Sequence, residues 1–119
     1  MKVITNINEA NILLKNFVGA NTQIFSFDIS HKKLIIRLTK EHLVEVLYIA
    51  VVSCEQITCS FSWKNMNMSI VSFKDKETKE TMTKIFDEES GFELVSSGGF
   101  SLAMGIESEF LKQQERFIP

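Results

Sequence analysis

Proline is almost missing from this chain of 119 residues, which has a single proline at position 119. The sequence also lacks Ser-rich and Gly-rich tracts, so it contains no linker, no low-complexity segment and no internal repeat that we can find. A chain of this length usually forms one compact unit. We therefore predict a single domain over residues 1–119.

Long apolar runs are missing as well. Residues 43–52 form the most apolar segment, but they include Glu45 and span about half the length that a membrane helix needs. The residues that follow Lys2 are too polar for the apolar centre of a secretory signal. We therefore expect a cytoplasmic protein that does not contact a membrane. Its two cysteines, Cys54 and Cys59, should be reduced, and their odd spacing on one strand would direct them to opposite faces.

Side chains that carry enzyme chemistry are scarce. His31 and His42 are the only histidines, both in predicted turns, and no zinc-binding or phosphate-binding motif includes them. Glu88 and Glu89 are adjacent acids, but a turn follows them at once, which favours solvent exposure. We therefore predict no catalytic residues, no cofactor and no metal site, and a protein that is not an enzyme. With only two arginines, we also expect no binding to nucleic acid.

Residues 54–63 alternate polar and apolar side chains almost without a break. A period of two is typical of a β-strand with one wet and one dry face. We predict that the dry face carries Ile57, Cys59, Phe61 and Trp63. Residues 43–52 are apolar on both faces, as expected of a central strand that other layers cover.

Further strand patterns and two helical patterns complete the prediction of the fold. Apolar spacing predicts a helix over residues 7–18, before Gly19, and a short helix over residues 106–117. Residues 82–87 are ambiguous between strand and helix, and we favour a strand. The fold class that we predict is mainly β (α+β). It has about eight antiparallel strands in a curved sheet, sandwich or partly open barrel, with an N-terminal helix and a short C-terminal helix.

The strand register of one hairpin can be predicted from its charged residues. If Leu38 lies opposite Val44, Arg37 lies beside Glu45 in a cross-strand pair of opposite charge.

A second hairpin is predicted around residues 97–99. If Gly99 takes a left-handed conformation in a three-residue loop, Leu94 pairs with Leu102 and the apolar faces match.

The charge of −2 is unevenly distributed. Residues 1–84 carry a net charge of +3 (11 basic and 8 acidic groups), whereas residues 85–111 carry −6 with no Lys or Arg. Such asymmetry can attract a basic partner, although an acidic edge that only limits aggregation is the alternative. Partner-binding residues are predicted to be Asp87, Glu88, Glu89 and Glu93. Exposed strand edges would also allow a homodimer.

The chain's aromatic residues suggest an alternative function. A small-molecule binder would need an apolar pocket in the sheet, and our candidates for its lining are Phe25, Tyr48, Phe61 and Trp63.

The order of several segments resembles that of a known class of proteins. These segments are LIIRL, ITCSFSW, MSIVSF and IFDEESGFELVSSGGFSL. Across residues 20–104 the chain is similar to small bacterial immunity proteins of polymorphic toxin systems and to related uncharacterised families. The resemblance implies a protein that binds and neutralises a toxin without catalysis. It carries over no partner-binding residues by motif, but many toxin nucleases are basic, which favours the acidic region over residues 85–111 as the binding surface.

Overall fold

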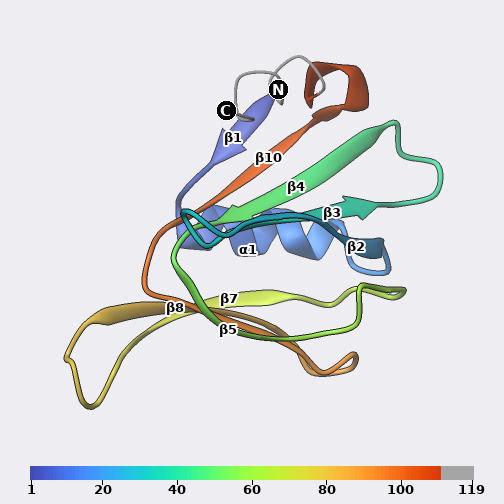
Figure 1. Cartoon of the computed structure of the whole chain (residues 1–119). Coiled ribbons are helices and arrows are strands. Elements are labelled where there is room, and N and C mark those ends of the chain that lie inside the picture. Colours follow the sequence, from blue (N-terminus) through green and yellow to red (C-terminus); the bar gives the residue numbers. More distant parts are fainter. Residues whose placement is uncertain (111–119) are drawn as a thin grey trace.

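A computed structural model describes residues 1–110 of the chain (Figure 1). In this part the elements are β1 (Lys2–Ile4), α1 (Ile7–Asn16), β2 (Asn21–Asp28), β3 (Lys33–Thr39), β4 (Glu45–Val51), β5 (Cys54–Thr58), β6 (Ser62–Trp63), β7 (Ser69–Lys74), β8 (Thr81–Asp87), β9 (Phe92–Ser96) and β10 (Phe100–Ile106). Residues 107–110 are helical. The predicted C-terminal helix over residues 106–117 therefore begins here, and its remainder lies outside the described residues.

The strands form two antiparallel sheets. One has the order β1-β10-β4-β3-β2-β6 and the other has the order β5-β9-β8-β7. Figure 1 shows α1 between the two sheets. The prediction of a mainly antiparallel β fold is confirmed, and neither sheet closes into a barrel. The described residues form ten strands rather than about eight, because β1 and β6 have three and two residues and carry too little pattern to detect.

One apolar core joins the two sheets and the helix. It is formed by the inward side chains of all three layers. The largest buried members include Leu14, Phe17, Ile36, Leu38, Leu47, Ile49, Met66, Ile70, Ile85, Phe92, Leu94 and Leu102. Because β4 lies between β10 and β3, its central position was predicted correctly. The strand over residues 82–87 is also confirmed, as β8.

Helix α1 begins at the predicted Ile7 and ends at Asn16, two residues before the predicted end. The side-chain oxygen of Asn6 accepts hydrogen bonds from the backbone N–H groups of Asn8 and Glu9, at 2.9 and 3.1 Å. These bonds satisfy donors that the first helical turn leaves free. After the helix, Gly19 has a φ of +92°, a value that most other residues avoid. The predicted N-terminal helix is therefore confirmed.

The pairing of β3 with β4 differs from the prediction. Leu38 lies opposite Leu47 rather than Val44. The difference is three residues, an odd number, so it exchanges the inner and outer faces of β4. The predicted pair of Arg37 and Glu45 is therefore wrong. The loop between the strands is longer than the predicted one, and the other set of alternating β4 side chains therefore faces the core.

The predicted hairpin around Gly99 is also wrong. Leu94 and Leu102 belong to different sheets, because β9 pairs with β5 and β8 whereas β10 pairs with β1 and β4. The chain crosses between the sheets at Gly98. A Cβ atom there would lie 2.8 Å from the carbonyl oxygen of Val52, whereas one at Gly99 would meet nothing within 4 Å.

The alternating segment over residues 54–63 does not form one continuous strand. It contains β5, a connecting loop and the short β6. The predicted dry face is wrong, since Ile57 is 45% exposed and Phe61 is 89% exposed. Trp63 alone packs against the core, where its ring stacks on Phe92 at 5.0 Å. β5 is the edge strand of its sheet, and every residue of it after Cys54 is exposed.

Candidate functional site

The acidic residues near the C-terminus gather in two separate places. Glu107, just after β10, forms an ion pair with Arg37, and Glu109 pairs with the N-terminal ammonium group at 2.8 Å. In the other sheet, Glu88 and Glu89 lie in the turn between β8 and β9 and are exposed. Neither has an ion-pair partner among residues 1–110. The unpaired negative charge is therefore concentrated at the β8–β9 turn.

Asp87 is buried beneath this turn and has a structural role. Its exposed fraction is 0%. Its carboxylate accepts hydrogen bonds from the backbone N–H groups of Asn67, at 2.9 Å, and Glu89, at 3.1 Å. It therefore fixes the turn to the loop that precedes β7. Asp87 was predicted to contact a partner, but its side chain is buried and its carboxylate binds backbone N–H groups.

A groove of about 390 Å³ opens beside the turn. Cross-strand register places Val71, Lys84, Phe86 and Glu93 on the outer face of the four-stranded sheet. These side chains line the groove together with Glu88, and we call it the acidic groove. The structure thus brings Glu88 and Glu93 of the predicted site to one groove, and Glu89 lies in the adjacent turn.

Lys84 shows how the acidic groove can hold a cation. Its ammonium nitrogen lies 3.7 Å from a carboxylate oxygen of Glu93 and 5.3 Å from the ring centroid of Phe86. An aromatic face and a carboxylate both attract a positive charge. This ion pair is largely solvent-exposed, so it adds little to folding stability. Lys84 and Phe86 were not predicted from the sequence, although their spacing of two on β8 is a signal that places both on one face.

The predicted aromatic pocket is not formed. Tyr48 and Trp63 lie on opposite faces of the six-stranded sheet, because Trp63 pairs with Thr22 on the inner face. Tyr48 points outward, where its ring contacts Phe25 at a centroid distance of 5.2 Å. Phe61 is exposed in the loop after β5. One pocket therefore cannot include all four of these residues.

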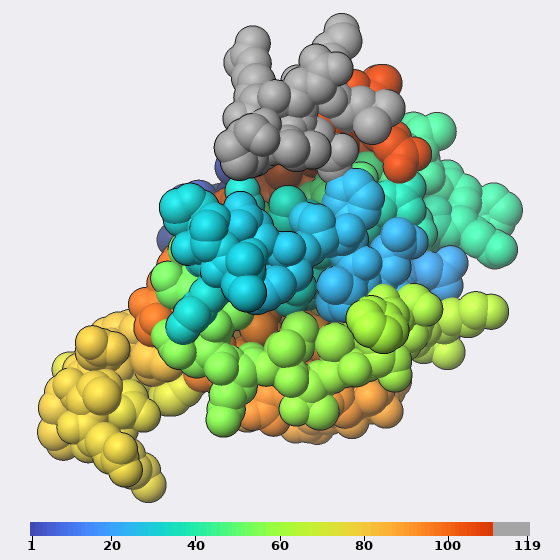
Figure 2. Space-filling view, in the orientation of Figure 1, coloured from blue at the N-terminus to red at the C-terminus, as the bar shows by residue number. Residues whose placement is uncertain are grey.

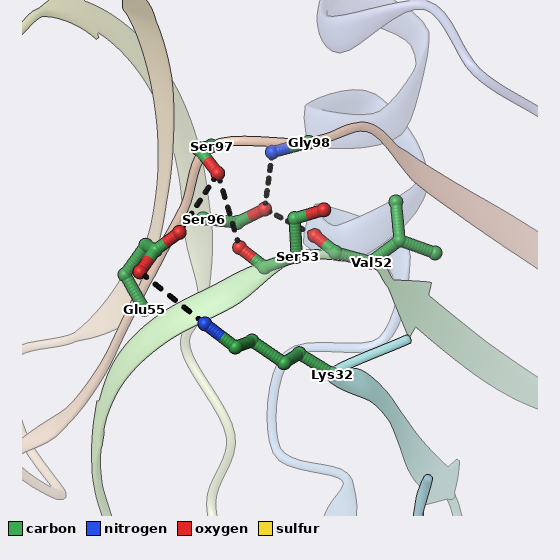
Figure 3. Close-up of polar contacts among 7 residues, drawn as sticks. All are labelled: Lys32, Val52, Ser53, Glu55, Ser96, Ser97 and Gly98. Carbon is green, nitrogen blue, oxygen red and sulfur yellow. Dashed lines mark hydrogen bonds and ion pairs between the residues drawn. The ribbon is translucent and has the colours of Figure 1, made fainter. Parts of the chain in front are cut away.

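A second and larger cleft, of about 600 Å³, lies where the chain passes between the sheets. Residues 29–33, from the turn between β2 and β3 and the first residue of β3, form one side, and Ser53, Glu55 and Ser97 lie opposite. We call it the junction cleft. The Ser97 hydroxyl donates to Glu55 at 2.9 Å, and the Lys32 ammonium nitrogen lies 3.9 Å from the other oxygen of that carboxylate (Figure 3).

The backbone holds the two sides of the junction cleft together. The N–H of Ser53 donates to the carbonyl of His31 at 3.2 Å, and the N–H of Cys54 donates to the carbonyl of Lys32 at 3.0 Å. In Figure 2 the cyan turn accordingly lies against the green start of β5. Next to these bonds, the Ser96 hydroxyl donates to the carbonyl of Val52 (Figure 3). The cleft is therefore a fixed part of the fold.

Histidine and cysteine side chains do not form a reactive centre among residues 1–110. His31 lies in the junction cleft, and His42 lies in the loop between β3 and β4. No cluster of His, Cys, Asp and Glu within the described part of the chain could hold a metal ion. Burial raises the pKa of the Cys54 thiol, which lowers its thiolate fraction and its nucleophilicity. Cys59 is exposed.

Comparisons with protein-family models, with curated proteins and with solved structures found no match. None of the helices over residues 1–110 has the length and apolar character to cross a membrane. The acidic groove and the junction cleft are therefore the candidate functional sites.

Proposed function

We propose that this protein is a non-enzymatic protein-binding module whose acidic groove binds a basic partner protein. The observation that carries the proposal is the exposed, unpaired charge of Glu88 and Glu89 beside a groove that contains the ring of Phe86. Such a combination of a charged rim and an aromatic centre is common where proteins bind one another.

The contacts of Lys84 support a mode of binding. A lysine or arginine of the partner would lie over the Phe86 ring and pair with Glu88, as Lys84 does with Glu93. The exposed carboxylates would mainly raise the association rate, because charges at a rim steer the encounter of two proteins. The aromatic contact would mainly slow dissociation, since it loses water on binding.

The resemblance to immunity proteins supports a toxin as the partner. A basic nuclease toxin would fit the charge of the acidic groove, and the module would inhibit it by occupation rather than by chemistry. In that role the protein would act in the cytoplasm of a bacterium. The edge strand β5 supports homodimerisation as an accompanying proposal, because an unpaired edge can pair with a second copy.

Capture of a partner from the native host tests the proposal. The immobilised protein is exposed to host extract at low and high salt, and the retained proteins are identified and quantified. We expect a protein of high isoelectric point to be retained at low salt and released as salt screens the charges. The purified partner then provides an association rate constant.

Two charge-reversed variants make this experiment specific. The first is Glu88→Lys with Glu89→Lys, at the acidic groove. The second is Glu77→Lys with Glu80→Lys, which makes the same change of charge on the β7–β8 loop that projects from the molecule (Figure 2, yellow). The first variant should lose the partner, and the second should keep it. Equal retention by both variants, or no basic partner with the unmodified protein, would overturn the proposal.

A further inference from the structure

The junction cleft is built from other elements than the acidic groove and has the opposite balance of charge. Among the residues that line it are three basic side chains, His31, Lys32 and Lys33, and one carboxylate, Glu55. The nearby carboxylate of Asp28 accepts hydrogen bonds from the N–H and the hydroxyl of Ser30, at 2.9 and 2.7 Å. The lining of the cleft therefore combines basic side chains with hydroxyl groups, and Glu55 and Asp28 offset part of the positive charge.

Two residues of the junction cleft hold a backbone conformation that glycine would adopt more easily. Lys32 has a φ of +47° and Ser53 a φ of +54°. For residues with a Cβ atom this conformation is costly, and such residues often occur at functional sites. Here the two residues lie on facing sides of one cleft, next to the backbone hydrogen bonds that join those sides.

We propose that the junction cleft binds the phosphate group of a small phosphomonoester. A phosphate accepts several hydrogen bonds at once, and in the cleft the Lys32 ammonium group and the Ser97 hydroxyl approach the Glu55 carboxylate from separate segments (Figure 3). The volume of about 600 Å³ lies within the range of small-molecule sites and leaves space for an organic group beside the phosphate.

Glu55 competes with the phosphate for Lys32. The two side chains are 3.9 Å apart, and both are substantially exposed, with exposed fractions of 43% and 58%. A pair with this separation and exposure opens readily. The phosphate would take the place of the Glu55 carboxylate as the partner of Lys32. Removal of the negative charge at Glu55 should therefore tighten the binding of an anion.

Titration of the full chain with inorganic phosphate, glucose 6-phosphate and glucose tests the inference, with calorimetry and amide chemical shifts as readouts. Either phosphate should shift the amides of residues 29–33, Ser53 and Ser97, and glucose should not. Lys32→Gln should weaken phosphate binding about tenfold. Lys76→Gln removes the same charge from the exposed β7–β8 loop and should leave binding unchanged.

Glu55→Gln provides the opposite test, because the amide still accepts from Ser97 but carries no charge. This variant should bind phosphate more tightly than the unmodified protein. The inference is overturned if neither phosphate shifts the amides of the cleft, if Lys32→Gln and Lys76→Gln bind equally, or if Glu55→Gln weakens binding. None of these results depends on the acidic groove, so the two proposals can fail separately.

Discussion

The side-chain amide of Asn11 forms two hydrogen bonds with the backbone of Ile70. Its nitrogen donates to the Ile70 carbonyl at 2.8 Å, and its oxygen accepts from the Ile70 N–H at 2.8 Å. Asn11 lies on α1, and Ile70 lies on β7, the edge strand of the four-stranded sheet. The amide thus takes the place of a neighbouring strand and attaches the helix to that edge.

Asn11→Ala should lower the free energy of unfolding by about 2 kcal/mol, because the Ile70 backbone loses both partners in a partly buried position. Urea denaturation of this variant and of Asn8→Ala measures the effect. Asn8 is exposed on the same helix, and its replacement should change stability little. Similar unfolding midpoints for the two variants would contradict the role of the amide.

Asp87→Ala should lower the free energy of unfolding by about 3 kcal/mol, since it removes a buried carboxylate and leaves the partly buried backbone N–H groups of Asn67 and Glu89 without their acceptor. Glu88→Gln is the matched control, because Glu88 is exposed in the adjacent turn and should affect stability little. Thermal unfolding compares them. If Asp87→Ala were as stable as Glu88→Gln, the carboxylate would not anchor the turn.

The crossing between the sheets makes the two adjacent glycines unequal. Gly98→Ala should destabilise the fold by about 2 kcal/mol, because the new methyl group would lie against the backbone carbonyl of Val52. Gly99→Ala should be tolerated, since the space around it is open. Chemical denaturation of both variants measures the difference. Greater damage from Gly99→Ala would instead support the hairpin that the sequence predicted.

Removal of two buried hydroxyl groups, one at Thr22 and one at Ser96, should have different effects on the stability of the fold. The hydroxyl of Thr22 has no hydrogen-bond partner within the described residues, so Thr22→Val should hold or raise stability. The hydroxyl of Ser96 donates to Val52 and accepts from Gly98, so Ser96→Ala should cost about 2 kcal/mol. Calorimetric unfolding gives both values. A loss of stability in Thr22→Val would show that its hydroxyl is bonded in solution.

Local signals in the sequence predicted local structure well. The N-terminal helix, the strand over residues 82–87 and the central position of β4 are all confirmed. Each of these depends on neighbouring residues or on one face of one strand. Short-range chemistry was sufficient for them.

Long-range pairing could not be predicted in the same way. Successive strands were expected to pair, but β4 and β5 belong to different sheets, and so do β9 and β10. The alternation of polar and apolar residues also does not distinguish a central strand from an edge strand. For this reason the apolar face of residues 54–63, which includes Phe61, was expected to be buried. The burial of Asp87 follows from its contact with Asn67, twenty residues away, and its neighbouring acids gave no sign of it.

An irregularity in β2 also could not be predicted from the sequence. Its pairing with β3 shifts between Ile24 and Ser26, which is a β-bulge at Phe25. A bulge breaks the alternation of faces, so Phe25 and Phe27 need not point the same way. No residue in this stretch is a glycine that would have marked the irregularity.

The most direct test of the proposed function is an amide chemical-shift map of the labelled protein during titration with its captured basic partner. Binding at the acidic groove predicts that the largest changes occur over residues 84–93 and in Val71, and that Glu88→Lys with Glu89→Lys removes them. Changes confined to the outer face of the six-stranded sheet, around Tyr48, would contradict the proposal.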